Sequence, residues 1–190
     1  NLFVYVAGNP VNRVDPSGEI DPKILQNAGA GVPVVLPNGS KIPSYPWGTT
    51  PYVMSPLSDL SDVAAAGRNT GRTYRDFLDN PEPLGNALPY LFYQLYLDLS
   101  HFGTFDYQRS RCKGKITQYP QFRDVSNVNV GLYGQQAGLT IDEVLRYAGI
   151  WAKYKSSNAD PNDPYSLDRR TRYFIEVGYR IGASGVFNPR

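Results

Sequence analysis

Aspartates with aromatic or basic neighbours are the first residues of this sequence that could do chemistry. Asp106 lies between Phe105 and Tyr107, a setting that withdraws a carboxylate from water and raises its pKa. Asp163 and Asp168 lie together in a second acidic stretch. A hydrolase needs one carboxyl group that protonates a leaving group or activates water, and another polar group that holds charge. We therefore treat Asp106, Asp163 and Asp168 as candidate catalytic residues.

Structural roles compete with catalysis at two of these positions. Asp163 precedes Pro164, and the pair suits the N-cap and first position of a helix. Asp168 would then lie within that helix, four residues before Arg172, where it could form a surface ion pair. For Asp106 the structural and functional interpretations carry equal weight.

Two asparagines and a tyrosine form a second candidate group. Asn127 and Asn129 are two residues apart and are followed by Tyr133. Both amides face the same side only if the backbone is extended there, because helical residues two apart diverge. The alternative is that an asparagine caps a helix that begins near Ser126. We keep Asn127 and Asn129 as candidate catalytic residues and Tyr133 as a substrate contact.

Two further ionisable residues favour structural roles. His101 ends an apolar stretch, where a cation stabilises the C-terminus of a helix. Glu143 follows Thr140 by three residues, which predicts a capping box.

Basic residues with aromatic neighbours form a possible binding surface. The run has no intervening acid and is interleaved with Tyr107, Tyr119 and Phe122; it consists of Arg109, Arg111, Lys113, Lys115 and Arg123. Such a mixture can bind phosphates and stack bases, although a solvated basic face is the commoner explanation. Fifteen tyrosines could instead line a saccharide groove. The candidate substrate-binding residues are Tyr107, Tyr133, Arg169, Arg111 and Lys113.

The elements that must position these residues are mostly helices. Apolar residues at helical spacing predict helices near residues 58–78 (broken near Gly67 and Gly71), 84–102, 126–136, 141–151 and 164–181. The strand predictions are a hairpin over 32–42 and two basic strands within 103–125. We expect a mainly α (α+β) fold, a compact helical domain with a few short strands or hairpins.

Composition excludes several classes of protein. The chain has 190 residues and a net charge of +2, too little for strong attraction of the whole molecule to nucleic acid. One cysteine excludes an internal disulfide and a cysteine-rich zinc site, and one histidine excludes multi-histidine metal centres. The longest apolar stretch, residues 88–99, is too short to span a bilayer, so we expect no stable membrane insertion.

The first nineteen residues behave differently from the rest. The only methionine is Met54, so we expect that the chain is the C-terminal part of a longer protein. Residues 1–19 contain a short apolar run and two turns, too little to bury their own strand. We therefore divide the chain into 1–19, an irregular Pro- and Gly-rich lead-in over 20–56, and a domain over 57–190.

Within that first segment, Pro10-x-x-x-x-Asp15-Pro16-x-Gly18 resembles the PxxxxDPxGL motif that closes the core of Rhs (YD-repeat) proteins. The resemblance implies a β-shell upstream that encloses a C-terminal toxin and cuts it free just after the motif. It also implies a self-cleavage role for Asp15, with Glu19 standing where the family has Leu and with a fragment that begins near Ile20. Carboxylates that share a proton can activate water against a peptide bond.

The rest of the chain is similar to the polymorphic toxin domain called bacterial toxin type 44. The likeness is carried, in the family's order, by residues 103–108 (GTFDYQ), 126–134 (SNVNVGLYG), 160–164 (DPNDP), Asp168-Arg169 and Ile175-x-x-Gly178. This resemblance implies a biological role, a toxin, more than a particular reaction.

Together the two resemblances imply an antibacterial effector of the Rhs type that is secreted and delivered into a target cell. We expect its C-terminal domain to be a hydrolase without cofactor or metal, acting on a macromolecule of a competitor cell. One alternative is a cytoplasmic DNase or RNase that uses residues 109–123, with Asp106 and Asp168 holding a divalent ion. Another is a non-enzymatic toxin that binds the envelope or forms pores. The implied protein partners are the upstream Rhs shell and a cognate immunity protein.

Overall fold

A computed structural model describes residues 22–80, 84–112 and 114–188 of the chain. Predictions for residues 1–19, which include Asp15, Glu19 and Ile20, and for Lys113 lie outside these residues. The described helices are α2 (Pro22–Asn27), α3 (Ser61–Asp79), α4 (Leu84–Leu99), α5 (Arg123–Gln136), α6 (Ile141–Lys155) and α7 (Arg169–Ala183), with the 3-10 turn η1 (Pro120–Phe122). Two antiparallel two-stranded sheets pair β1 (Val32–Pro33) with β2 (Met54–Ser55), and β3 (Arg109–Cys112) with β4 (Lys115–Gln118). The predicted mainly α (α+β) fold is confirmed.

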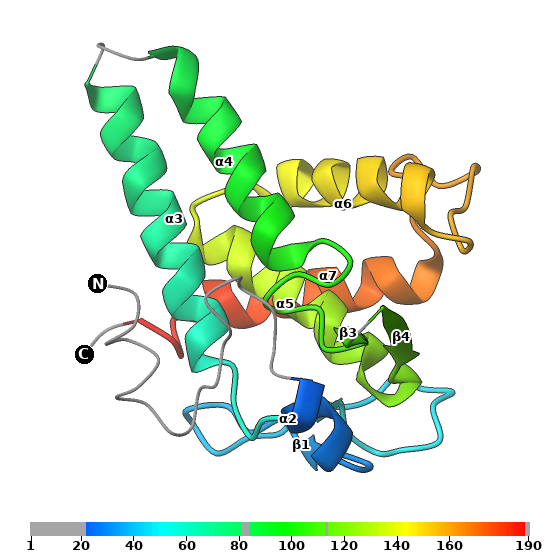
Figure 1. Cartoon of the computed structure of the whole chain (residues 1–190). Helices are drawn as coiled ribbons and strands as arrows, with labels where there is room; N and C mark the ends of the chain where they lie inside the picture. Colours follow the sequence, from blue (N-terminus) through cyan, green and yellow to red (C-terminus); the bar gives the residue numbers. More distant parts are fainter. Residues whose placement is uncertain (1–21, 81–83, 113, 189–190) are drawn as a thin grey trace.

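Helix α5 is the centre of the fold, and α7 packs most closely against it (Figure 1). The helices approach closely because glycine faces backbone at the crossing. A Cβ at Gly131 would collide with the carbonyl oxygen of Ile175, and one at Gly178 with that of Val128. The fully buried side chains Val128, Leu132 and Phe174 fill the core around this crossing.

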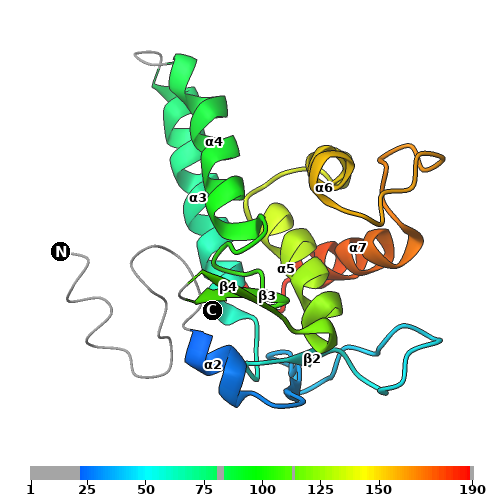
Figure 2. The ribbon, with the colours of Figure 1, turned by 45° about the vertical axis from the view of Figure 1, so that its right-hand side comes forward.

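Helices α3 and α4 lie side by side as an antiparallel hairpin that projects from the rest (Figures 1 and 2). The predicted break of the first helix near Gly67 and Gly71 is wrong, because α3 runs unbroken. These glycines instead let α3 meet α5, since a Cβ at either would collide with a backbone carbonyl oxygen, of Tyr133 and Ala137 respectively.

Two helices begin at residues that differ from the prediction. Helix α7 begins at Arg169 with Asp168 as its N-cap, not at Pro164. Asp163 closes a separate turn instead, in which its Oδ1 accepts the amides of Tyr165 and Leu167 at 2.9 and 3.3 Å. Ser166 then has a φ of 58°, which ends that turn before the helix starts.

The start of α5 also differs, whereas that of α6 agrees. Helix α5 begins at Arg123, and Ser126 does not cap it, because its hydroxyl donates to the carbonyl of Phe122 one turn earlier. The predicted capping box of α6 is confirmed, with Thr140 and Glu143 each accepting the other's backbone amide.

The lead-in region contributes to the same core as the helices. Leu25, Val34, Ile42 and Val53 are all buried in the main hydrophobic cluster, although this segment has only short helical and strand elements. None of the described helices has the length and hydropathy of a membrane span.

Candidate functional site

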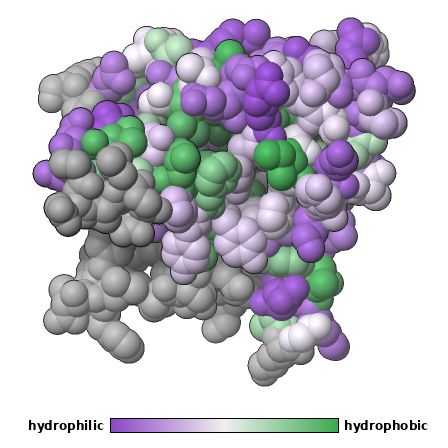
Figure 3. Space-filling view, turned by 90° about the horizontal axis from the view of Figure 1, so that it is seen from above, coloured by the Kyte–Doolittle hydropathy of each residue, from purple (hydrophilic) through white to green (hydrophobic). Residues whose placement is uncertain are grey.

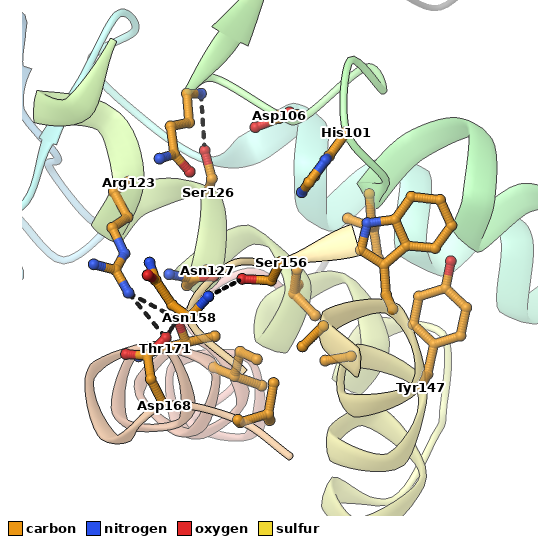
Figure 4. Close-up of a pocket in the computed structure, with 18 of the residues that line it drawn as sticks. His101, Asp106, Arg123, Ser126, Asn127, Tyr147, Ser156, Asn158, Asp168 and Thr171 are labelled. Atoms are coloured by element: carbon orange, nitrogen blue, oxygen red, sulfur yellow. Dashed lines mark hydrogen bonds and ion pairs between the residues drawn. The ribbon is translucent and has the colours of Figure 1, made fainter. Parts of the chain in front are cut away.

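A cavity of about 120 Å³ opens between α5, α6, α7 and the loop that follows α4 (Figure 4). We call it the central cavity. Its polar and ionisable lining comprises His101, Asp106, Gln108, Arg109, Arg123, Ser126, Asn127, Ser156, Asn158, Asp168 and Thr171, with Tyr147 and Trp151 as its aromatic wall. Three of the five predicted catalytic residues, Asp106, Asn127 and Asp168, therefore meet at one place although they are far apart in the sequence.

Arg123 provides a fixed positive charge on one side of the central cavity. Its Nη2 donates to Oδ2 of Asp168 at 2.9 Å and to Oγ1 of Thr171 at 3.3 Å. The Asp168 carboxylate is fixed in turn, because its Oδ1 accepts the amides of Arg170 and Thr171 at the start of α7. The predicted pair between Asp168 and Arg172 is wrong. Arg172 bonds to Asp163 and Glu176 instead.

Asp106 lies on the opposite side of the cavity and is 4% exposed. Its carboxylate accepts the amide of Phe102 at 2.9 Å and Nη1 of Arg109 at 3.2 Å. Burial raises the pKa of the Asp106 carboxyl and outweighs the opposite effect of Arg109 and the Phe102 amide. The bond to Phe102 supports a residue with a φ of 68°, a left-handed conformation that a bulky residue adopts only when its surroundings hold it. Asp106 is therefore held by several hydrogen-bond donors, as expected of a carboxylate with a structural role.

His101 belongs to the loop that Asp106 holds, and its ring points into the cavity (Figure 4). The imidazole packs edge-on against Trp151, with ring centroids 5.9 Å apart. Burial, together with the charges of Arg109 and Lys155, lowers the pKa of His101 to about 4. The imidazole is therefore neutral at physiological pH, and the predicted positive charge at a helix end is wrong.

Asn127 and Asn129 diverge because the backbone is helical there. Asn127 lines the cavity, and no hydrogen bond of its amide is seen within the described part of the chain. Asn129 is buried on the other side of α5, where its Nδ2 donates to the carbonyl of Phe105 at 3.0 Å. Its Oδ1 is buried without a partner among the described residues. Asn129 therefore supports the loop behind the cavity and does not face it.

The described members of the predicted substrate-binding set, Tyr107, Arg111, Tyr133 and Arg169, do not line the central cavity. Tyr107 and Tyr133 are buried, and the Tyr133 hydroxyl lies 2.6 Å from both Thr70 Oγ1 and Asp98 Oδ2. Burial raises the pKa of both phenols, which remain protonated. Both tyrosines therefore lie in the core of this structure and not at its surface. Arg111 is exposed on β3, with its guanidinium 4.5 Å from the ring centroid of Phe102.

The two remaining predicted residues, Asp163 and Arg169, line a second, more open concavity beside Trp47 and Tyr173. There Asp163 already holds two backbone amides and the guanidinium of Arg172, whose Nη1 lies 2.9 Å from its Oδ2. The carboxylate of Asp163 is thus occupied by structural contacts.

Sequence reasoning missed the aromatic wall and gave His101 the wrong role. Trp151 lies at the end of the helix predicted over 141–151; its ring borders the cavity and its Nε1 is buried without a partner among the described residues. A single histidine at a helix end has no local pattern that distinguishes a site residue from a helix-end charge. Its contact with Trp151 depends on a residue 50 positions away, so it is visible only in the folded chain.

Carboxylates that could hold a metal ion are already bonded to arginine. Asp106 is bonded to Arg109, and Asp168 to Arg123. Within residues 22–80, 84–112 and 114–188, no group of three or more His, Cys, Asp or Glu side chains is arranged to bind a metal ion.

Comparisons of the chain with protein-family models, with curated proteins and with solved structures find no match. Function is therefore inferred from the cavity and from the motifs in the sequence.

Proposed function

We propose that this chain carries the C-terminal toxin domain of an Rhs-type effector, and that the domain is a hydrolase whose active site is the central cavity. The observation that carries the proposal is the convergence of His101, Asn127 and Arg123, a neutral imidazole, a free amide and a fixed cation, around one cavity. Hydrolysis needs these three capabilities: a group that takes up a proton, a donor that orients the substrate, and a positive charge for the oxygen that becomes negative.

His101 can accept a proton from water because its imidazole points into the cavity, is neutral and makes no hydrogen bond among the described residues, although its lowered pKa makes it a weak base. Asn127 lines the same cavity, and its side chain has no hydrogen-bond partner in the part of the chain that the structure describes, so its amide can donate to a substrate oxygen. Arg123 supplies positive charge, and Asp168 acts as a positioning residue that holds the guanidinium in place. Asp106 is a second positioning residue, since it supports the loop that carries His101.

The toxin role is supported by two sequence resemblances, to the end of the Rhs core and to bacterial toxin type 44. Their test uses the full-length precursor, in which Asp15→Asn replaces a carboxylate by an amide of nearly the same shape. We expect release of the fragment that begins near Ile20 to stop, as judged on a gel. Release at the wild-type rate would remove Asp15 from the cleavage reaction and weaken the Rhs assignment.

The proposed hydrolase activity is tested by expressing the chain in bacteria, with and without export to the periplasm, and counting the surviving cells. We expect His101→Gln and Asn127→Ala each to reduce killing by about 100-fold or more, with melting temperatures close to that of the wild type. Asn69→Ala, at an exposed position of α3, is the matched control and should kill like the wild type. Full killing by both cavity variants would contradict the proposed site.

A nuclease is the second candidate, and the β3–β4 hairpin favours it. Strand β4 is exposed along its whole length, and β3 begins at Arg109, which lines the cavity. A hairpin that presents Arg111 and Lys115 next to the cavity could bind a phosphate backbone. Killing that occurs only in the cytoplasm, together with degradation of purified DNA or RNA, would favour this candidate.

A further inference from the structure

Exposed aromatic residues cover adjoining sides of α4 and α6. On α4 these are Phe92 and Tyr96, one helical turn apart, and both are about half exposed. On α6 the corresponding stripe consists of the exposed residues Ile150 and Tyr154, the latter 75% exposed, and the half-buried rings of Tyr147 and Trp151. We call these six residues the aromatic face. Only part of the apolar stripe of α4 belongs to the core: Leu91 and Leu95 are buried, whereas Phe92 is about half exposed.

The aromatic face is one continuous surface because its rings touch between the helices. The ring centroids of Phe92 and Tyr147 are 6.2 Å apart, and those of Tyr96 and Trp151 are 5.6 Å apart. In the view from above, green hydrophobic and pale side chains gather toward the middle of the surface (Figure 3). Contiguous exposed apolar surface of this kind commonly marks a binding site.

The face leads into the central cavity. Tyr147 and Trp151 belong to both, since each lines the cavity and also touches an exposed ring of α4. Trp151 further contacts His101, the proposed proton acceptor. A polymer that lies on the face would thus have one of its bonds next to His101.

Charge identifies the kind of polymer. Residues 84–99 contain no Lys or Arg, and their one acid, Asp98, accepts the hydroxyl of Tyr133. A nucleic acid needs cations along its path for its phosphates, and α4 offers none. On α6 the basic residues beside the face are Arg146, which is paired with Asp142, and Lys153 and Lys155 at the end of the helix. Tyrosine and tryptophan rings combine an apolar face with a polar edge. Sugar rings have the same combination, C–H groups on the face and hydroxyls at the edge.

From these observations we propose that the aromatic face binds a polysaccharide strand, which is the substrate cut in the central cavity. From Tyr147 to Tyr154 the helix rises about 10 Å, so the face is longer than a single sugar ring. In the reaction, the oxygen of water with one hydrogen adds to one carbon of the glycosidic bond, and the other hydrogen passes to the leaving oxygen. No oxidant, reductant or cofactor is consumed. This substrate assignment rests on the proposed hydrolase function.

The test measures binding separately from cutting. The probes are purified peptidoglycan sacculi and chitin, both insoluble polymers of amino sugars, and the bound fraction is measured by sedimentation of the His101→Gln variant of the full chain. We expect the His101→Gln variant to sediment with at least one of the two probes. Adding Tyr96→Ser and Tyr154→Ser to this variant should weaken binding about tenfold or more. Adding Tyr52→Ser instead, an exposed tyrosine on a different part of the surface, should leave binding unchanged.

Every other outcome overturns the proposal. These are failure to bind either polysaccharide, unchanged binding by the double variant, stronger binding to single-stranded DNA or RNA, binding to lipid vesicles, or a dimer on gel filtration that the double change disrupts. Whether the domain is a hydrolase is tested independently, by the killing assay with the cavity variants. Loss of killing by His101→Gln without any polysaccharide binding would leave the hydrolase standing and reject only its substrate.

Discussion

Arg123 in α5 and Asp168 at the start of α7 are joined by a bond of 2.9 Å between Nη2 and Oδ2, so one carboxylate both caps a helix and fixes a cation at the central cavity. These two tasks can be separated by substitution, because asparagine is as good an N-cap as aspartate but carries no charge.

Asp168→Asn should therefore retain the cap and loosen only Arg123. We expect killing to fall about tenfold while the free energy of unfolding changes by less than about 1 kcal/mol. Asp168→Ala removes the cap as well and should cost about 1 kcal/mol more. Survival counts and urea unfolding of the same preparations check this; equal stability of the two variants would show that the cap contributes nothing.

Asp106→Asn should destabilise the fold. The sequence left a structural and a functional role for Asp106 equally open. The observed donors, the Phe102 amide and Arg109, lead us to expect a loss of about 2 kcal/mol, since a buried carboxylate is replaced and the partly exposed Arg109 guanidinium loses its charged partner.

Thermal melts of Asp106→Asn and wild type measure this loss directly. Asp142→Asn is the control, because Asp142 forms an exposed pair with Arg146 and its replacement should leave the melt nearly unchanged. If Asp106→Asn melts like the wild type but no longer kills, Asp106 acts on the substrate directly.

Gly178→Ala should destabilise the packing of α5 against α7, although alanine has the better helix propensity. The added methyl group would collide with the backbone carbonyl of Val128, which cannot move without shifting a buried helix. We expect a loss of about 2 to 3 kcal/mol, measured by urea unfolding. Asn69→Ala adds helix propensity at an exposed site of α3 and should be neutral or slightly stabilising. Equal stability of Gly178→Ala and wild type would mean that the helices are farther apart than described.

His101 should make the fold less stable in mild acid. In the unfolded chain the imidazole takes up a proton near its ordinary pKa of 6.5, whereas in the folded chain it does so only near 4. Between these values the unfolded state binds more protons, so this contribution is complete above about pH 6.5 and is lost as the pH falls toward 4.

The measurement compares urea midpoints of wild type and His101→Gln at neutral pH and near pH 4.5. We expect the wild type to lose more stability than the variant, because glutamine does not titrate. Killing or hydrolysis should stay constant from about pH 5.5 to 8, where the imidazole is neutral throughout. A parallel loss of stability in both proteins would show that His101 is solvated and titrates normally.

Local pattern predicted the five longer helices of this protein, but not the short helix α2 or the pairing of β1 with β2. Apolar spacing predicted five helical segments, and the Thr140–Glu143 capping box is present as expected, because both features involve residues within one or two turns of each other. The same local signals led to the wrong start of α7, where Asp163 and Asp168 are equally good caps in sequence. The choice depends on the turn that Asp163 closes and on the contact of Asp168 with Arg123.

The sequence by itself also singled out Asp106, Asn127 and Asp168, since residue type and neighbourhood mark candidate site residues. Only the tertiary structure decided that they line one cavity, that Asn129 and Tyr133 are buried away from it, and that His101 faces it. The physical reason is that burial, the divergence of neighbouring helical side chains and the charges around His101 all come from segments brought together by folding. Such contacts produce no periodic pattern in the sequence.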